Sequence, residues 1–402
     1  MTILMRFALD SLRVMLRGGP RYYALLAVLV LGVLVGLAAY VQQLQHGLIV
    51  TGMGDQVTWG VYIANFTFLV GVAAAAVMVV IPAYVFGDAE MKRVVLIAEA
   101  MAVAACALAL LFVIVDLGRP DRMLNIVPLL SHVNFPRSLL AWDVVVIPGY
   151  LVINLVIPAA VLFANYRGRT LSHRRMMPVI LLAILWAIAL HVVTAFLYVA
   201  DVAKPFWHSP LLGPRFLASA FASGPALLLG VLHVLDAVTS LRLSDGVRRL
   251  LANITAIALQ INLVMLAAEI FTELYRPTEH SLSARYLFLG LGEADGLVIW
   301  IRAAIAMEVT AVAILMVPRL QRATAPLLCA CALTVFGVWI EKGMGLVVPG
   351  FIPTPLGEVV EYVPTMVETL VSLGLWCLGT LIFVLLARPI IAINEGVLGE
   401  NP

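Results

Sequence analysis

The sequence predicts an all-α integral membrane protein with about ten transmembrane helices, arranged as two parallel-repeat four-helix bundles flanked by spans one and ten. Three observations support this fold class. Of the 402 residues, 63% are hydrophobic and only 12% are charged, whereas a soluble domain is about half apolar and a quarter charged. Ten apolar segments reach the roughly 20 residues that a bilayer crossing needs. A motif at the end of the third segment recurs 157 residues later.

The ten segments follow one another without an extramembrane insert, so residues 1–402 form a single membrane domain. The expected spans are 22–47, 59–86, 94–116, 139–165, 178–200, 214–241, 248–274, 297–318, 323–345 and 363–387. The first run is too long for a signal-peptide core and lacks a small-residue cleavage site, so we expect it to be retained. The domain then divides into a first span (22–47), a first four-helix bundle (59–200), a second one (214–345) and a last span (363–387).

The recurring motif is a carboxylate, an arginine and a helix-stopping proline. It reads Asp116-Leu117-Gly118-Arg119-Pro120 in the first copy and Glu273-Leu274-Tyr275-Arg276-Pro277 in the second. The same offset carries Trp59 to Phe216, where an apolar run begins in each half. A repeat of this length predicts a duplicated bundle whose two copies share one membrane orientation. A structural role is the alternative: Asp116 and Glu273 would pair with Arg119 and Arg276, or with Lys and Arg of the other half, and lock the ends of spans.

Lysine and arginine placement predicts the orientation. One side of the expected topology holds sixteen basic residues and the other holds seven, and the cytoplasmic side is the richer one. We therefore expect an inner-membrane protein with both termini in the cytoplasm. The outer loops, about 117–138, 201–213, 276–296 and 346–362, are the longer ones and are rich in Pro and Gly, which favours ordered turns.

Ionisable residues inside the expected spans gather toward the outer side. A charged group within a bilayer is a candidate functional residue because it must be paired or hydrated. The residues that we expect to form the rim of a site or a proton path are Asp116, Arg119, His191, Glu269, Glu308 and Glu341. The asymmetry favours chemistry at the outer interface. Two alternatives remain: a proton conduit through His191, Glu308 and Glu341, and a secondary transporter, since parallel repeats also occur there.

The outer ends of spans one to four carry the groups that a buried quinol needs, namely an apolar slot, hydrogen bonds to two oxygens and a proton acceptor. Gln42 and His46 lie one turn apart on one helix face and reach one oxygen. Tyr62, Asn65 or Asp143 holds the other, and Trp142 walls the slot together with Trp59. We predict that His46 and Asp143 are the catalytic residues, because either can accept the protons that leave on oxidation.

Metal cofactors are not expected in this chain. The four cysteines lie in apolar runs, and Cys329 and Cys331 point to different helix faces, so neither a zinc site nor an iron–sulfur cluster is encoded. A b-type haem needs two histidines at matched depth on facing spans, but His191 and His233 lie in opposite halves of the membrane. The formal charge of +2 gives no reason to expect a nucleic-acid partner.

The segment from Trp59 to Asn65, with Gly71 and the Asp116–Pro120 motif, resembles the NrfD/PsrC family of membrane quinone-interacting subunits. The ten-span layout and the segment from Asn134 to Asp143 are most similar to the DsrP-type subunit of sulfite-reduction-associated complexes. The resemblance covers nearly the whole chain. In the family pattern a histidine and an amide on the first span line the quinone head group, which His46 and Gln42 match. A tyrosine expected on the fourth span is replaced here by Trp142 and Asp143.

The resemblance implies a haem-free subunit that exchanges electrons between menaquinone or ubiquinone and a partner protein. It implies a quinol-dependent oxidoreductase complex with a role in sulfur metabolism, of which this chain is a subunit rather than a stand-alone enzyme. The implied partners are a periplasmic ferredoxin-like iron–sulfur subunit, a multihaem cytochrome c, a haem b membrane subunit and a cytoplasmic iron–sulfur subunit. The sequence also predicts that Arg119, Arg122 and Arg137 on the outer loops meet an acidic partner surface.

Overall fold

The computed structural model describes residues 2–74, 76–126, 135–275 and 281–399. Within these ranges the chain is helical and has no β-strand, only an isolated bridge between Leu291 and Ala294. The described residues contain ten helical runs that are long and apolar enough to cross a membrane, which confirms the predicted fold class. The runs are Pro20–His46, Val61–Val85, Ala89–Asp116, Leu139–Tyr166, Arg174–Val199, Leu212–Val238, Asp245–Tyr275, Val298–Met316, Thr324–Phe351 and Met366–Asn394.

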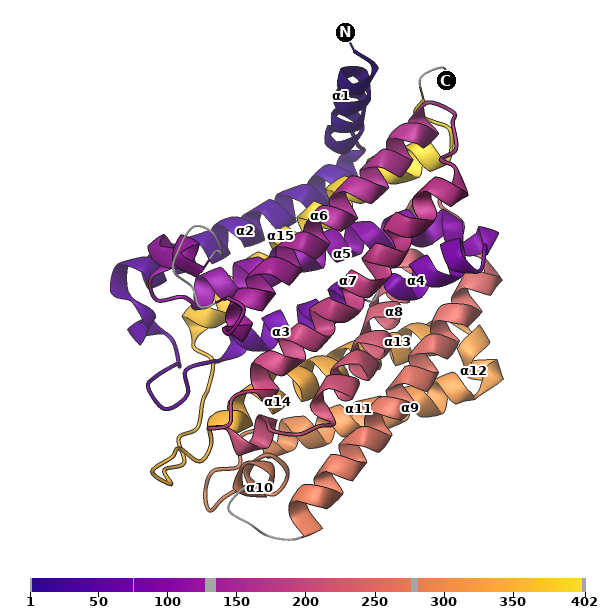
Figure 1. Cartoon of the computed structure of the whole chain (residues 1–402). Helices are drawn as coiled ribbons and strands as arrows, with labels where there is room; N and C mark the ends of the chain where they lie inside the picture. Colours follow the sequence, from indigo (N-terminus) through magenta and orange to yellow (C-terminus); the bar gives the residue numbers. More distant parts are fainter. Residues whose placement is uncertain (1, 75, 127–134, 276–280, 400–402) are drawn as a thin grey trace.

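The helices fall into two groups that share one interface (Figure 1). The first group is α3 (Val61–Ala74), α4 (Val77–Val80), α5 (Ala89–Asp116), α6 (Leu139–Tyr166) and α7 (His173–Val199). The second group is α8 (Leu212–Val238), α9 (Asp245–Tyr275), α11 (Val298–Met316) and α13 (Thr324–Trp339). Helix α8 packs against both α3 and α7, which joins the two groups. We call them the first and second bundles; their origin by duplication stays a prediction, and Arg276 and Pro277 of the second motif lie outside the described residues.

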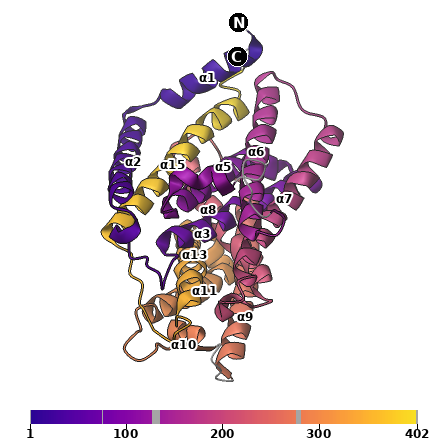
Figure 2. The same cartoon turned by 60° about the vertical axis from the view of Figure 1, so that its left-hand side comes forward.

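Two further spans, α2 (Pro20–His46) and α15 (Met366–Asn394), pack against each other beside α5. They run side by side in both views (Figures 1 and 2). Their contact is close because two glycines face each other. A Cβ added at Gly36 would lie 2.5 Å from the Cα of Gly374, and one added at Gly374 would lie 2.6 Å from the Cα of Gly36. Small residues that let backbones approach are the usual basis of helix association in lipid.

We expect Gly36→Ala to destabilise the protein by about 1–3 kcal/mol, because the added methyl group overpacks a contact between two backbones. Thermal unfolding of the detergent-purified protein measures this. Gly32→Ala is the matched control: its Cβ would meet only the side chain of Cys377, with the Sγ at 2.5 Å, and that side chain can turn away. Equal unfolding temperatures for the two variants would contradict the importance of the close packing between Gly36 of α2 and Gly374 of α15.

The short helix α1 (Ile3–Leu16) lies across the ends of α6 and α15, near both termini of the chain (Figure 2). The ring of Phe7 packs edge-on against Phe163 and Tyr166, and the Tyr166 hydroxyl donates a hydrogen bond to Asp10. The guanidinium of Arg388 donates to the carbonyls of Val14 and Arg17. The last span was predicted to end at residue 387. Helix α15 continues past it, where Arg388 is held by α1 and the apolar residues Ile390 and Ile391 are buried.

The ninth span is not a uniform α-helix. After α13 the chain forms a π-helical turn, Ile340–Met344, then α14 (Gly345–Val347) and a 3₁₀ turn, Val348–Phe351. A π-helical turn inserts an extra residue into the helix and shifts the faces that follow. Here it carries the adjacent ionisable residues Glu341 and Lys342, and both side chains are buried. The ninth span therefore places two neighbouring charges inside the protein.

Candidate functional site

Three buried polar groups meet where α2, α3 and α5 converge. We call this end of the bundles, where Tyr62 and Asp116 lie, the outer end, after the predicted orientation. The side-chain amide of Gln43 donates through Nε2 to the Val115 carbonyl at 2.7 Å. The Tyr62 hydroxyl donates to Oε1 of Gln43 at 2.7 Å. Gln43 and Tyr62 are 3% and 0% exposed, so both side chains are buried.

Asp116 and Glu368 extend this polar group. The Oδ1 atom of Asp116 is buried and has no hydrogen-bond partner among the described residues. Glu368, at the start of α15, accepts hydrogen bonds from the Tyr362 hydroxyl at 2.5 Å and from the Gly52 amide at 2.7 Å. Burial, followed by the Glu368 carboxylate, raises the pKa of Tyr362, so the phenol remains a donor at neutral pH. The Glu368 carboxylate therefore already accepts hydrogen bonds, whereas Oδ1 of Asp116 is available to accept one.

The predicted pair Gln42 and His46 lies on a different face of α2. Both side chains are exposed, and the His46 ring contacts the Gln42 carbonyl through Nδ1 at 2.9 Å. Sequence reasoning missed Gln43, although a signal was present. The buried face of α2 passes through Gly36 and Ala39, and helical spacing of three to four residues then leads to Gln43. A quinone contact by Gln42 or His46 stays a prediction, and it would require a ligand on the exposed face of α2.

Asn65 joins three helices. Its amide nitrogen donates to the Val61 carbonyl at 2.8 Å, while its Oδ1 accepts the indole N–H groups of Trp339 and Trp376, each at 3.0 Å. The residue is 1% exposed. These contacts tie α3 to α13 and α15 and leave the carbonyl of Asn65 occupied. A quinone contact by Asn65 stays a prediction, and the observed geometry favours a structural role.

The other predicted residues of the first bundle divide between its interior and its rim. Asp143 accepts a hydrogen bond from Thr194 at 2.9 Å through Oδ1, and its buried Oδ2 has no partner among the described residues. The indole of Trp142 instead donates to the Pro136 carbonyl at 2.7 Å, outside this interior. His191 is 1% exposed, and its Nε2 is also without a partner in the part of the chain described.

Arg119 does not pair with Asp116. It is exposed and forms a two-pronged contact with Asp121, with both distances 3.0 Å. Its guanidinium lowers the pKa of the Asp121 carboxyl. The structural alternative for the motif, in which Arg119 locks Asp116, is therefore not the arrangement found, and Asp116 faces the protein interior without that cation.

The second bundle contains a buried ion cluster, which we define as Arg215, Asn262, Glu269, Glu308 and Glu341. Arg215 forms ion pairs with Glu269 and Glu341, and its Nε donates to Oε1 of Glu341 at 3.0 Å. Asn262 donates to Glu308 and to Glu341, each at 3.3 Å. Glu308 is 0% exposed and its Oε1 has no hydrogen-bond partner among the described residues. Three of the predicted rim residues thus converge, from α9, α11 and the ninth span.

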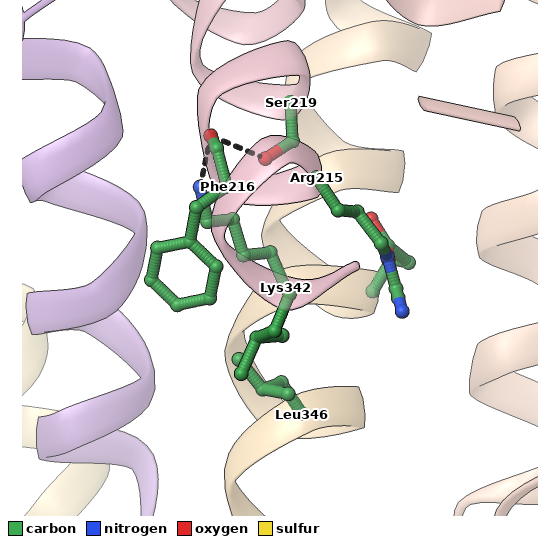
Figure 3. Close-up of a pocket in the computed structure, with 7 residues that line it drawn as sticks. Arg215, Phe216, Ser219, Lys342 and Leu346 are labelled. Atoms are coloured by element: carbon green, nitrogen blue, oxygen red, sulfur yellow. Dashed lines mark hydrogen bonds and ion pairs between the residues drawn. The ribbon is translucent and has the colours of Figure 1, made fainter. Parts of the chain in front are cut away.

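A small cavity lies against this cluster (Figure 3). Arg215 and Glu341 line one part of it, and Lys342, Phe216 and Ser219 line another. Its size suits about one water molecule. The positions 157 residues before Arg215, Asn262 and Glu269 are Thr58, Ala105 and Phe112. The first bundle therefore lacks these groups at the matching positions, and the cluster belongs to the second bundle.

No group of three or more His, Cys, Asp or Glu side chains suited to a metal ion occurs in the ranges that the structure describes. The structure is thus that of a multi-pass membrane protein. Amide, phenol and carboxyl side chains lie at its outer end, and the second bundle holds an ion cluster. Residues 49–352 match the family model described as Polysulphide reductase, NrfD. This match covers most of the chain, and the protein belongs to the NrfD family.

Curated relatives are similar along much of their lengths. The chain is 29% identical to a candidate membrane subunit of the dimethyl sulfoxide reductase of Halobacterium salinarum, over 89% of this chain and 88% of the relative. It is 27% identical to the Hdr-like menaquinol oxidoreductase integral membrane subunit of Archaeoglobus fulgidus, over 94% and 96%. It is 25% identical to a selenate reductase subunit of Mesobacillus selenatarsenatis, over 61% and 64%. All three relatives are named as subunits of reductases or oxidoreductases.

Proposed function

We propose that the protein is the membrane subunit of an oxidoreductase complex and exchanges electrons between a quinone and a partner subunit. The NrfD family membership supports this function, and so does the menaquinol oxidoreductase subunit among the relatives. The observation that carries it is the group made of the buried pair Gln43 and Tyr62 and of Asp116, which follows the Val115 carbonyl bound by Gln43 and has a buried Oδ1. This group offers an amide, a phenol and an acceptor without a partner among the described residues, where three helices converge.

A quinol supplies two electrons and two protons when it is oxidised. The residues at the outer end match what its head group requires, since a quinol hydroxyl inserted between Tyr62 and Gln43 would accept from the phenol and donate to Oε1, which leaves neither group unpaired. Asp116 would hold a departing proton on Oδ1, and general-base chemistry requires such an acceptor within hydrogen-bond reach. Tyr362 and Glu368, which bond each other, would fix the wall behind it.

The finer assignment follows the sequence resemblance. We propose menaquinone or ubiquinone as the quinone, a DsrP-type complex of sulfur metabolism, and a periplasmic ferredoxin-like iron–sulfur subunit as the electron partner. A multihaem cytochrome c, a haem b membrane subunit and a cytoplasmic iron–sulfur subunit would complete it. Arg119, Arg122 and Arg137 are all exposed, which supports an acidic docking partner at the outer end. Both termini lie at the opposite end (Figure 1), which suits the proposed placement of both in the cytoplasm of an inner-membrane protein.

The neighbours Gln42 and Gln43 provide a matched test of the site. We expect Gln43→Ala and Tyr62→Phe each to weaken the binding of a quinol-analogue inhibitor to the purified complex by about tenfold, the effect of about 1.4 kcal/mol. Gln42→Ala should leave the affinity unchanged, because its side chain is exposed on another face of α2. Inhibitor titration of quinol oxidation measures all three. Weaker binding in Gln42→Ala and His46→Ala, with Gln43→Ala unaffected, would move the site to the exposed face.

A second function is favoured by the ion cluster. Burying three carboxylates and an arginine inside a membrane bundle is costly, and such groups often mark proton relays. The cluster reaches from Arg215, near the start of α8, to Glu308, ten residues into α11 and so about 15 Å from its outer end. We propose that quinone chemistry at the outer end is coupled to proton movement through this cluster, with His191, Glu308 and Glu341 among the carriers.

A further inference from the structure

Neither proposed function uses helix α1, which nevertheless presents three distinct faces. One face is turned to the protein, where Phe7 and Asp10 contact α6. A second face is apolar and exposed: Leu4, Leu12 and Leu16 are 62%, 49% and 58% exposed. Residues spaced by four or eight positions lie on the same side of a helix, so the three leucines form one stripe. Such a stripe is stable only against an apolar environment.

The third face of α1 is basic. The side chains of Arg6 and Arg13 are 51% and 65% exposed, and Arg17, which follows the helix, is exposed as well. The carboxylate oxygens of Asp10 lie 3.8 Å from Nε of Arg6 and 3.1 Å from Nη1 of Arg13. Asp10 thus orients both arginines but takes only part of their N–H groups, because a guanidinium has five donors. Residues 2–21 contain four arginines against this one aspartate, so the segment favours an anionic surface.

Hydrogen bonds to the last carbonyls of α1 fix its direction relative to α2. The Tyr22 hydroxyl donates to the Met15 carbonyl at 2.5 Å. The Tyr23 hydroxyl donates to the Leu16 carbonyl at 3.1 Å, and Arg388 holds the same end of α1 from α15. Figure 2 shows that α1 turns sharply away from α2 and runs across the ends of α6 and α15. Because α2 is a span, α1 lies where this span leaves the membrane, a depth at which tyrosines are common.

The membrane borders this part of the protein. Helix α2 exposes the large apolar side chains of Val28, Leu31 and Leu34, as a lipid-facing span does. A helix in the membrane interface buries its apolar face among the acyl chains and places its basic side chains at the headgroups. Helix α1 has this arrangement, since Arg13 follows Leu12 and so lies about 100° round the helix from it. The exposed stripe is aliphatic, whereas the core of a protein interface is enriched in aromatic side chains, so a lipid surface is favoured over a protein partner.

We propose that α1 binds the anionic phospholipids of the membrane leaflet at the end of the protein where both termini lie. The three exposed leucines enter the acyl region. The three arginines that follow one another along the basic face donate charge-assisted hydrogen bonds to lipid phosphates. Bound in this way, α1 holds the start of α2 against the end of α15. The inference requires only that the protein spans the membrane, and it is independent of the proposed quinone and proton functions.

The test is hydrogen–deuterium exchange of residues 3–16 in the purified full-length protein, placed in nanodiscs of phosphatidylcholine alone or mixed with phosphatidylglycerol. We expect the backbone amides of α1 to exchange about tenfold more slowly in the anionic discs, because each arginine near anionic headgroups adds to the attraction. The triple variant Arg6→Gln, Arg13→Gln, Arg17→Gln should lose this difference between the discs. The matched control is Arg169→Gln, Arg174→Gln, Arg175→Gln, which removes the same charge from exposed side chains where α6 connects to α7. This control should keep the difference.

The apolar stripe is tested by Leu4→Ser combined with Leu12→Ser, which should speed the exchange of α1 in both kinds of disc. Equal exchange of wild-type α1 in the two kinds of disc would overturn the proposal. A triple arginine variant that keeps the difference would overturn it as well, since the basic face would then not bind the lipid. If α1 is protected only when partner subunits are bound, a protein covers this face and the lipid site is wrong. Exchange of the buried helix α5, measured in the same samples, identifies any variant that has lost its fold.

Discussion

Replacing Arg215 with methionine is expected to lower the free energy of unfolding by about 3–5 kcal/mol, the usual cost of removing one partner from a buried ion pair. Arg215 is 8% exposed and is paired with two carboxylates, Glu269 and Glu341. The methionine fills a similar volume but leaves both carboxylates buried without their cation. Thermal unfolding of the detergent-purified protein, followed by loss of the monodisperse peak in size-exclusion chromatography, measures the effect.

Two further variants show whether the uncompensated charge is the cause. Arg302→Met removes an exposed arginine whose guanidinium donates to a backbone carbonyl, that of Phe288 at 3.1 Å, so its effect should be within about 0.5 kcal/mol. The triple variant Arg215→Met, Glu269→Gln, Glu341→Gln removes the charges together and should recover much of the stability, because replacing a whole buried ionic group is often nearly neutral. A triple variant less stable than Arg215→Met alone would refute this explanation.

The spans were predictable because the bilayer imposes one simple requirement on them. A helix that crosses it must be long and apolar, and the length and hydropathy of each run are visible in the sequence. The helix ends were less predictable. The ninth span passes through π-helical and 3₁₀ turns to Phe351, and the last continues to Asn394, where Arg388 binds α1. Contacts between segments distant in the sequence decide where the ninth and last spans end, and composition alone does not reveal such contacts.

The residue types of the proposed site were predictable from the sequence, but the face of α2 that the structure buries was not. Sequence reasoning chose the outer ends of the first spans and the residues Tyr62 and Asp116, yet preferred Gln42 to Gln43. One residue turns a helical side chain by about 100°, so the choice depends on knowing which face packs against α15 and α5. The small residues Gly36 and Ala39 mark the face of α2 that is buried. The convergence of Arg215 with Glu341, 126 residues later, has no comparable local signal.

For the ion cluster, too, the sequence indicated the residues but not how they are placed relative to one another. The sequence grouped Glu308 and Glu341 with His191, but the structure separates them: the glutamates lie within the second bundle and His191 lies within the first. Lys342 lies between the two bundles, near Gly71 of α3, and its direction depends on a π-helical turn that the apolar pattern does not reveal. Irregular helical turns of this kind often occur at functional sites. The turn is therefore the structural feature that would connect the proposed quinone chemistry to the cluster.

Glu308→Gln is expected to abolish proton movement while quinol oxidation continues and the protein stays as stable as the wild type. The reason is the pairing of charge. Arg215 is bonded to Glu269 and Glu341. The hydrogen bond of Glu308 in the described residues comes from the Asn262 amide. Glutamine at position 308 therefore removes no ion pair among the described residues, keeps the shape and polarity of the side chain, and carries no transferable proton.

The same argument separates Glu308 from its neighbours. Glu341→Gln removes a charged partner of Arg215 and should lower the unfolding temperature, whereas Glu308→Gln should not. Glu99→Gln is the control for a buried carboxyl elsewhere, since Glu99 is 7% exposed and lies in the first bundle; it should leave the number of protons moved per electron unchanged. The measurement is pH change outside liposomes containing the complex after a quinol pulse. A Glu308→Gln complex that moves protons normally would show that the cluster is structural, and one that unfolds more readily would show that Glu308 carries a negative charge.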